Sequence, residues 1–113
     1  MDKLINWDDF TKVDMRCGEI VEATLNVKAI KPAYLLKIDF GEELGIKMSS
    51  AQITQNYQAH DLIGKKIVAV INFPPKKIAG IKSEVLVLAT VCETAGTLLL
   101  SAESDAINGS RVL

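Results

Sequence analysis

The residue types that most often carry out catalysis or hold metals are sparse in this chain. The two cysteines, Cys17 and Cys92, stand 75 positions apart in apolar surroundings without a CxxC spacing, and the single histidine, His60, lies in a polar stretch. A metal site needs several such ligands together, and a nucleophile needs a neighbouring base. We therefore predict two buried free thiols, an exposed loop histidine, and neither a metal nor a cofactor.

Other catalytic signatures are also missing from the sequence. There are no paired carboxylates at a catalytic spacing and no glycine-rich phosphate loop, and Ser49 and Ser50 adjoin no candidate base. The chain is therefore predicted not to be an enzyme. The chemistry that remains is binding.

Lysines offer the clearest binding chemistry because they are concentrated in one part of a nearly neutral chain. Thirteen Lys and Arg against fourteen Asp and Glu give a net charge of −1, which excludes a uniformly basic nucleic-acid-binding protein. Between Asp61 and Glu84, however, no acid occurs. The lysines of this stretch are Lys65, Lys66, Lys76, Lys77 and Lys82. Those that follow the rigid Pro74-Pro75 pair are placed either to meet phosphates or to keep two apolar strands soluble.

The segments that must position these lysines have mostly strand-like patterns. Apolar residues alternate along Ala33–Phe40 and again along Ile46–Ser50, which predicts a hairpin. A first strand starts near Val13 and changes parity at Gly18, where we predict a bulge. The other expected segments are a short helix at 6–10, a short helix or crossover at 51–64, long buried strands at 66–73 and 84–91, and a last strand at 97–102. At least five strands in about a hundred residues indicate a small all-β barrel.

Length and apolar runs limit the organisation of the chain. Its 113 residues suit one domain with a single core, and we assign residues 1–113 to it. Apolar runs such as Ile67–Ile71 are much shorter than the ~20 residues that cross a bilayer, so no membrane insertion is expected. Asp2, Asp8 and Asp9 stand where a signal peptide would be basic and then apolar. We expect a cytoplasmic protein.

Both ends of the sequence carry strong apolar residues outside the predicted strands. These residues are Leu4, Ile5, Trp7, Phe10, Ile107, Val112 and Leu113. They require cover, either by packing across the ends of one barrel or by dimerisation through the terminal segments. The pattern alone leaves both possibilities open.

Four separated motifs resemble those of a known family. They are Asp9–Gly18, Lys31–Tyr34, Lys47–Thr54 and Asn72–Leu86. In this order they resemble the CsaA branch of the tRNA-binding-domain family, over about residues 5–113. The resemblance implies an all-β, five-stranded OB-fold barrel with a short N-terminal helix. It also implies a homodimer assembled through terminal extensions, at residues 1–10 and about 97–113.

The same resemblance implies a non-enzymatic chaperone, linked to protein secretion, that binds unfolded or precursor polypeptides. A dry groove beside the sheet would suit such partners, because flexible, aromatic and stiff apolar contacts together accept varied sequences. The candidates for its lining are Phe40, Met48, Phe73, Pro74, Ile78 and Ile81. The alternative role for each is a contact in the core or in the dimer interface.

Other members of this family bind tRNA, so RNA binding is the alternative function. The candidate phosphate contacts are Lys47, Lys76, Lys77 and Lys82, with Ser49, Ser50, Gln52 and Asn72 as polar partners. Where the RNA-binding relatives carry an arginine before the loop glycine, this chain has Ala79. Phe73-Pro74-Pro75 likewise replaces their Leu-Lys-Pro. Both differences favour apolar contact over phosphate binding, although the two functions can coexist.

Overall fold

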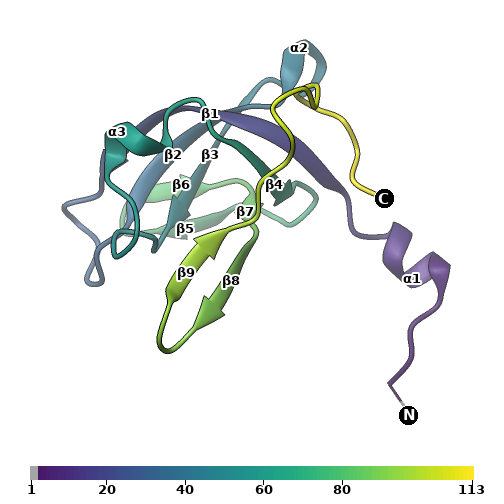
Figure 1. Cartoon of the computed structure of the whole chain (residues 1–113), viewed down its shortest axis with the longest axis horizontal. Helices are drawn as coiled ribbons and strands as arrows, with labels where there is room; N and C mark the ends of the chain where they lie inside the picture. The colour runs from purple at the N-terminus through teal and green to yellow at the C-terminus, as the bar shows by residue number, and fades with distance from the viewer. Residues whose placement is uncertain (1–2) are drawn as a thin grey trace.

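The computed structural model describes residues 3–113, and its centre is a five-stranded antiparallel sheet that curls into a nearly closed barrel (Figure 1). The strand order is β3-β2-β1-β4-β7. These strands are β1 (Met15–Leu25), β2 (Tyr34–Asp39), β3 (Ile46–Ala51), β4 (Lys66–Val70) and β7 (Leu86–Val87). Two separate hairpins pair β5 (Lys76–Ile78) with β6 (Ile81–Ser83), and β8 (Ala89–Cys92) with β9 (Gly96–Leu99). The predicted all-β barrel is confirmed.

Three short helices accompany the strands: α1 (Trp7–Thr11), α2 (Gly41–Leu44) and α3 (Ala59–Leu62). The predicted N-terminal helix begins at a capping box, in which Asn6 Oδ1 accepts from the Asp9 amide at 2.9 Å and the Asp9 carboxylate accepts from the Asn6 amide at 3.2 Å. Within residues 3–113, no helix has the length and apolar character needed to cross a membrane.

The barrel core follows the predicted alternation of β2. Tyr34, Leu36 and Ile38 are buried, whereas the residues between them are half-buried. Leu62 of α3 is also fully buried and belongs to the same cluster. Phe40, directly after β2, continues the alternation into the core and is only 1% exposed. The prediction that Phe40 lines a binding groove is therefore wrong.

The register of β1 against β2 shifts at Val21, not at Gly18 as predicted. Gly18 keeps regular pairing with β4 and faces the core. A Cβ at this position would lie 2.7 Å from both Ile38 Cγ2 and the ring of Phe40. The glycine is needed because two core side chains approach the backbone, and the bulge lies three residues later.

The segment predicted as one long strand at 84–91 is divided in the structure. Residues 86–87 pair with β4, and from Ala89 the chain leaves the barrel and pairs with β9. Val91 is therefore 83% exposed rather than buried. The pairing of this segment with β4 ends at Val68, whose carbonyl accepts from the Leu88 amide. The next residues of β4 pair with the chain after β9: Ile67 pairs with Ser101, and the Lys66 carbonyl accepts from the Ala102 amide.

The β5–β6 hairpin lies where the sequence predicted only a loop. Its two central turn residues are Ala79, with φ 50°, and Gly80, with φ 82°. Positive φ at both positions is characteristic of the type I′ turn, whose twist matches that of antiparallel strands. The glycine adopts this conformation readily, whereas Ala79 adopts it against its own preference.

The C-terminal segment returns to β1 and extends the sheet where β2 has ended. The Cys17 amide donates to the Ser110 carbonyl at 2.9 Å, and the Gly109 amide donates to the Cys17 carbonyl at 2.8 Å. The Val112 amide donates to the Met15 carbonyl, also at 2.8 Å. The otherwise open edge at the start of β1 is thereby paired.

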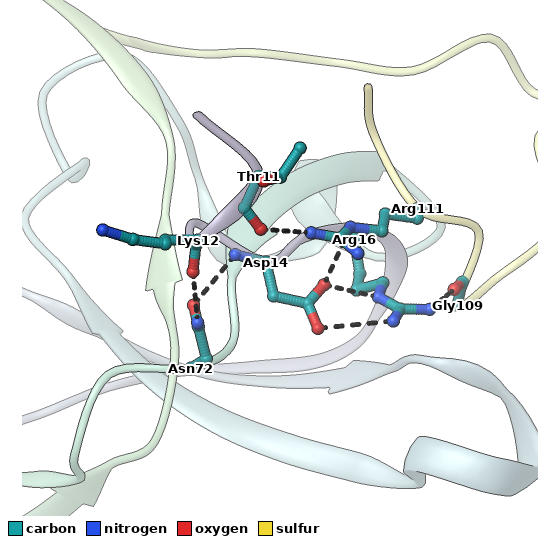
Figure 2. Close-up of polar contacts among 7 residues, drawn as sticks. All are labelled: Thr11, Lys12, Asp14, Arg16, Asn72, Gly109 and Arg111. Atoms are coloured by element: carbon teal, nitrogen blue, oxygen red, sulfur yellow. Dashed lines mark hydrogen bonds and ion pairs between the residues drawn. The ribbon is translucent and has the colours of Figure 1, made fainter. Parts of the chain in front are cut away.

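An ionic cluster fastens α1 and the C-terminal segment to the start of β1 (Figure 2). The Asp14 carboxylate accepts from Arg16 Nε at 2.6 Å and from Arg16 Nη2 at 3.3 Å, and it faces Arg111 Nε at 3.8 Å. Arg111 also donates to the Thr11 carbonyl at 2.7 Å, directly at the end of α1. The hydrogen bond from Arg16 lowers the pKa of the Asp14 carboxyl below its ordinary value.

We expect Gly18→Ala to lower the free energy of unfolding by about 1–3 kcal/mol, because its methyl group would collide with Ile38 and Phe40. Chemical denaturation monitored by circular dichroism measures the change. Thr24→Ala, on an exposed position of the same strand, is the matched control and should change little. Equal stability of the two variants would contradict the close approach.

We expect Asp14→Asn to lower the free energy of unfolding by about 1 kcal/mol at neutral pH, because both arginines lose a charged acceptor. The folded pKa of Asp14 is lowered, so its stabilisation is complete above the unfolded pKa and is lost as the pH falls through the folded value. The difference from the unmodified chain should therefore shrink in acid, below about pH 4. Asp105→Asn, at an exposed position, serves as the control, and a difference that grows in acid would contradict this assignment.

Candidate functional site

The barrel closes between β3 and the segment 83–85 through side chains as well as backbone. The Glu84 amide donates to the Met48 carbonyl at 2.8 Å, and Glu84 Oε1 accepts from the Met48 amide at 3.1 Å. Beside this pair, Ser83 Oγ accepts from the Ser50 amide at 3.1 Å, and Ser49 Oγ donates to the Val85 carbonyl at 3.0 Å. We call these contacts the seam.

A groove of about 400 Å³ lies next to the seam, and we call it the seam groove. Its apolar lining consists of Phe73, Pro74, Ile78, Val85 and Leu86, and its polar lining consists of Ser50, Lys76, Ser83 and Glu84. Phe73 and Leu86 are each about half exposed, so large apolar surfaces face water here. A groove of this kind suits noncovalent capture of apolar groups.

A second hollow, of about 450 Å³, continues along the barrel from the seam groove. Ser50 and Leu86 line both, so the two hollows are neighbours. The second hollow extends past Gln52 and Ile53 of the β3 side to Val91 and Leu99 of the β8–β9 hairpin. Together they give an open path for an extended ligand.

The β5–β6 hairpin, which we call the lysine hairpin, forms one wall of the seam groove. Lys76 lies directly opposite Ser83, and Lys77 lies directly opposite Lys82. Lys76 and Ser83 line the groove, whereas Lys77 and Lys82 do not. Because alternate strand residues point to opposite faces, the Lys77–Lys82 pair lies on the face turned away from the groove. None of these three lysines is in an ion pair within residues 3–113.

Five predicted binding residues line the seam groove: Ser50, Phe73, Pro74, Lys76 and Ile78. Two more, Lys77 and Lys82, lie on the hairpin beside the groove. Gln52 lies in the neighbouring hollow. Their role in binding remains a prediction.

The other predicted residues are not part of the groove. Ser49 is 1% exposed and its hydroxyl is used in the seam, so its prediction as an RNA partner is wrong. Asn72 uses both ends of its amide: Oδ1 accepts from the Asp14 amide at 2.9 Å, and Nδ2 donates to the Lys12 carbonyl at 2.7 Å (Figure 2). Lys47, Met48 and Ile81 are half-buried and lie outside the lining.

Sequence reasoning missed Ser83, Glu84, Val85 and Leu86 as lining residues. The one available signal was position, since Glu84 is the first acid after the lysine-rich stretch. An acid at the start of an apolar strand is ordinarily a solubilising surface residue. Its use as the acceptor that closes a barrel depends on where β3 lies.

Cys92 is an exposed free thiol on the β8–β9 hairpin, so the prediction that both cysteines are buried is wrong. Its hydrogen bond with Thr94 lowers the pKa of the thiol to about 7, whereas burial raises the pKa of the Cys17 thiol. The prediction of a buried Cys92 rests on its apolar neighbours in the sequence. His60 is exposed, as predicted. Among residues 3–113, no three His, Cys, Asp or Glu side chains gather as metal ligands.

Comparison with known proteins points to the same fold and to relatives of two kinds. A family model described as a putative tRNA binding domain matches residues 15–111. The crystal structure of chaperone CsaA from Bacillus anthracis str. Ames is 48% identical, covers 98% of this chain and 100% of its own, and superposes with a TM-score of 0.90. That of the CsaA chaperone protein from Picrophilus torridus is also 48% identical, with coverage of 97% and 100% and a TM-score of 0.90.

Longer relatives share the same segment. A methionine–tRNA ligase of Methanococcoides burtonii is 35% identical over 107 residues, which are 95% of this chain and 15% of that protein. The chain thus spans only a small part of the length of these ligases. By its matched residues and by its similarity in fold, this chain belongs to the tRNA-binding domain family, in the branch that contains the CsaA chaperones.

Proposed function

We propose that this chain is a non-enzymatic chaperone-like module that binds extended apolar segments of unfolded or precursor polypeptides. The observation that carries the proposal is the seam groove, in which Phe73, Ile78 and Leu86 present apolar surface to water. The similar structures described as CsaA chaperones support it, and secretion is the cellular process to which we link it. Two free thiols accord with a reducing, cytoplasmic location.

The size and chemistry of the groove suit an unfolded partner. About 400 Å³ accommodates a few side chains of an extended segment rather than the surface of a folded protein. Pro74 and Pro75 fix the backbone at one wall, so little conformational entropy is lost when a ligand binds there. The neighbouring hollow lets the segment continue along the barrel.

Transfer RNA binding is the second candidate function, and the Lys77–Lys82 pair favours it. Two like charges directly opposite each other destabilise a hairpin unless an anion lies between or above them. Phosphates would provide that anion, and the family model is named for tRNA binding. The absence of arginine in this hairpin predicts contact with phosphates as point charges rather than through a bidentate fork.

We also propose that two copies associate through their terminal extensions, residues 1–10 and about 97–113. Residues 1 and 2 lie outside the described residues. Leu4, Ile5, Trp7, Ile107 and Leu113 are all more than half exposed. The contact of Arg111 with Thr11 holds the two ends of the chain beside each other, as Figure 1 also shows. Exposed apolar residues at both ends are suited to a self-complementary interface.

Two variants separate the peptide site from the phosphate site. We expect Phe73→Ala to weaken the binding of a fluorescent unfolded apolar peptide by about 1 kcal/mol or more, because a half-exposed anchor of the groove is lost. A Lys77→Ala/Lys82→Ala double variant should leave peptide binding nearly unchanged, because neither side chain lines the groove. The same double variant should weaken tRNA binding and lower its salt slope by roughly two contacts. Fluorescence anisotropy measures both.

Ile46→Ala is the matched control, since Ile46 is an equally exposed apolar residue outside the groove. If Phe73→Ala and Ile46→Ala bind the peptide equally well, the groove is not the peptide site. Tight tRNA binding at physiological salt, lost in the lysine double variant and accompanied by no peptide binding, would reverse the order of the two candidate functions.

We expect a molecular mass of about twice 12.3 kDa in light scattering at micromolar concentration. Trp7→Asp should shift the mass toward that of one chain, because it places a charge in the apolar surface of the two ends. Ile46→Asp makes the same change at a comparably exposed position on β3 and should leave the mass unchanged. A mass near 12.3 kDa that does not change with concentration would refute the dimer.

A further inference from the structure

The loop between β1 and β2, residues 26–32, carries two aliphatic side chains with no cover. Ile30 is fully exposed and Val27 is 86% exposed. Branched aliphatic residues in a short loop normally fold back on the core, since each loses the benefit of burial when it stands in water. Their exposure on one short loop indicates an apolar contact outside the molecule.

Lysines lie beside Val27 and Ile30, both on the loop and on the lysine hairpin that it faces. Lys28 and Lys31 lie on the same loop and are exposed. Across a hollow of about 490 Å³, the loop faces Ile78 and Ala79 of the lysine hairpin. The Lys28 side chain approaches the hairpin turn at Gly80, so its charge is added to those of the hairpin.

The surface formed by loop 26–32 and the lysine hairpin is cationic without compensation. No acid occurs in residues 23–38 or 62–83, which include both segments. The next acid, Glu84, is turned into the seam, where its Oε1 accepts from the Met48 amide. Lys28 and Lys31, like the hairpin lysines, form no ion pair within residues 3–113. The natural partner of this surface is an anion of large extent.

The side-chain types favour a lipid surface over a nucleic acid. Arg16 and Arg111, the only arginines of the chain, are bound to Asp14, so no guanidinium is available for bidentate phosphate contact or for stacking. Loop 26–32 contains no aromatic residue on which a base would stack. Aliphatic tips among lysines are instead the combination that enters the boundary between headgroups and acyl chains of an anionic bilayer.

We propose that loop 26–32 and the lysine hairpin form a docking surface for an anionic lipid bilayer. Val27 and Ile30 enter the interfacial layer, and Lys28, Lys31 and the hairpin lysines contact lipid phosphates. This attachment is peripheral and leaves the chain outside the bilayer. The docking surface adjoins the seam groove, with which it shares Ser50 and Ile78, but no residue of loop 26–32 lines that groove.

Flotation of the full chain with vesicles tests the proposal. Vesicles of phosphatidylcholine with one third phosphatidylglycerol should bind the chain at low salt and release it at high salt, and vesicles of phosphatidylcholine alone should bind much less. A Val27→Ser/Ile30→Ser variant should lose about tenfold or more in affinity for the anionic vesicles. Lys28→Ala/Lys31→Ala should lose about 25-fold, at about fivefold for each lysine near an anionic surface.

Ile46→Ser and Lys12→Ala are the matched controls, because both residues are exposed and lie outside this surface. Thermal melting verifies that every variant is folded, and peptide binding by the Val27→Ser/Ile30→Ser variant should be intact, which separates this test from that of the seam groove. No binding to anionic vesicles, or equal loss in the controls, would overturn the proposal. So would a surface that binds tRNA but not vesicles and loses the tRNA in Lys28→Ala/Lys31→Ala.

Discussion

The seam between β3 and residues 83–85 is the contact on which the rest of this structure depends. A barrel strand is usually held by a continuous backbone ladder on both sides, but here the side chains of Ser49, Ser83 and Glu84 supply much of the bonding across the gap. Because the strands on the two sides of the seam do not pair along their length, hollows remain beside it. The same closure lets the lysine hairpin and the β8–β9 hairpin project from the barrel instead of completing it.

The arginines and most of the lysines without an ion pair lie in different parts of the molecule. Both arginines are engaged at Asp14, where planar donors reach a carboxylate and backbone carbonyls at once, and they connect the two ends of the chain to β1. Within residues 3–113, most of the lysines that form no ion pair lie on the lysine hairpin and on loop 26–32. The geometry of a guanidinium suits a defined internal partner, and a flexible ammonium suits a partner that varies in position.

Local patterns were enough to predict the parts of the fold that depend on neighbours in sequence. The alternation in β2, the β2–β3 hairpin and the cap at Asn6 follow from spacing alone. Gly18 is different, because the crowding that excludes a Cβ comes from Ile38 and Phe40 on another strand. The split of segment 84–91 depends in the same way on distant residues, because residues 101–102 pair with Ile67 and Lys66 of β4. Cys92 is exposed because of that split, and its apolar neighbours in the sequence could not predict this exposure.

The two faces of the lysine hairpin carry different side-chain chemistry. The two faces of a two-stranded hairpin carry alternate residues, so Lys76, Ile78 and Ser83 face the seam groove while Lys77 and Lys82 face outward. A peptide in the groove and an anion on the outer face therefore contact different side chains. Binding on one face requires no movement of the other, because the type I′ turn at Ala79-Gly80 fixes the register of both strands. The two proposed binding functions therefore depend on different side chains of one hairpin.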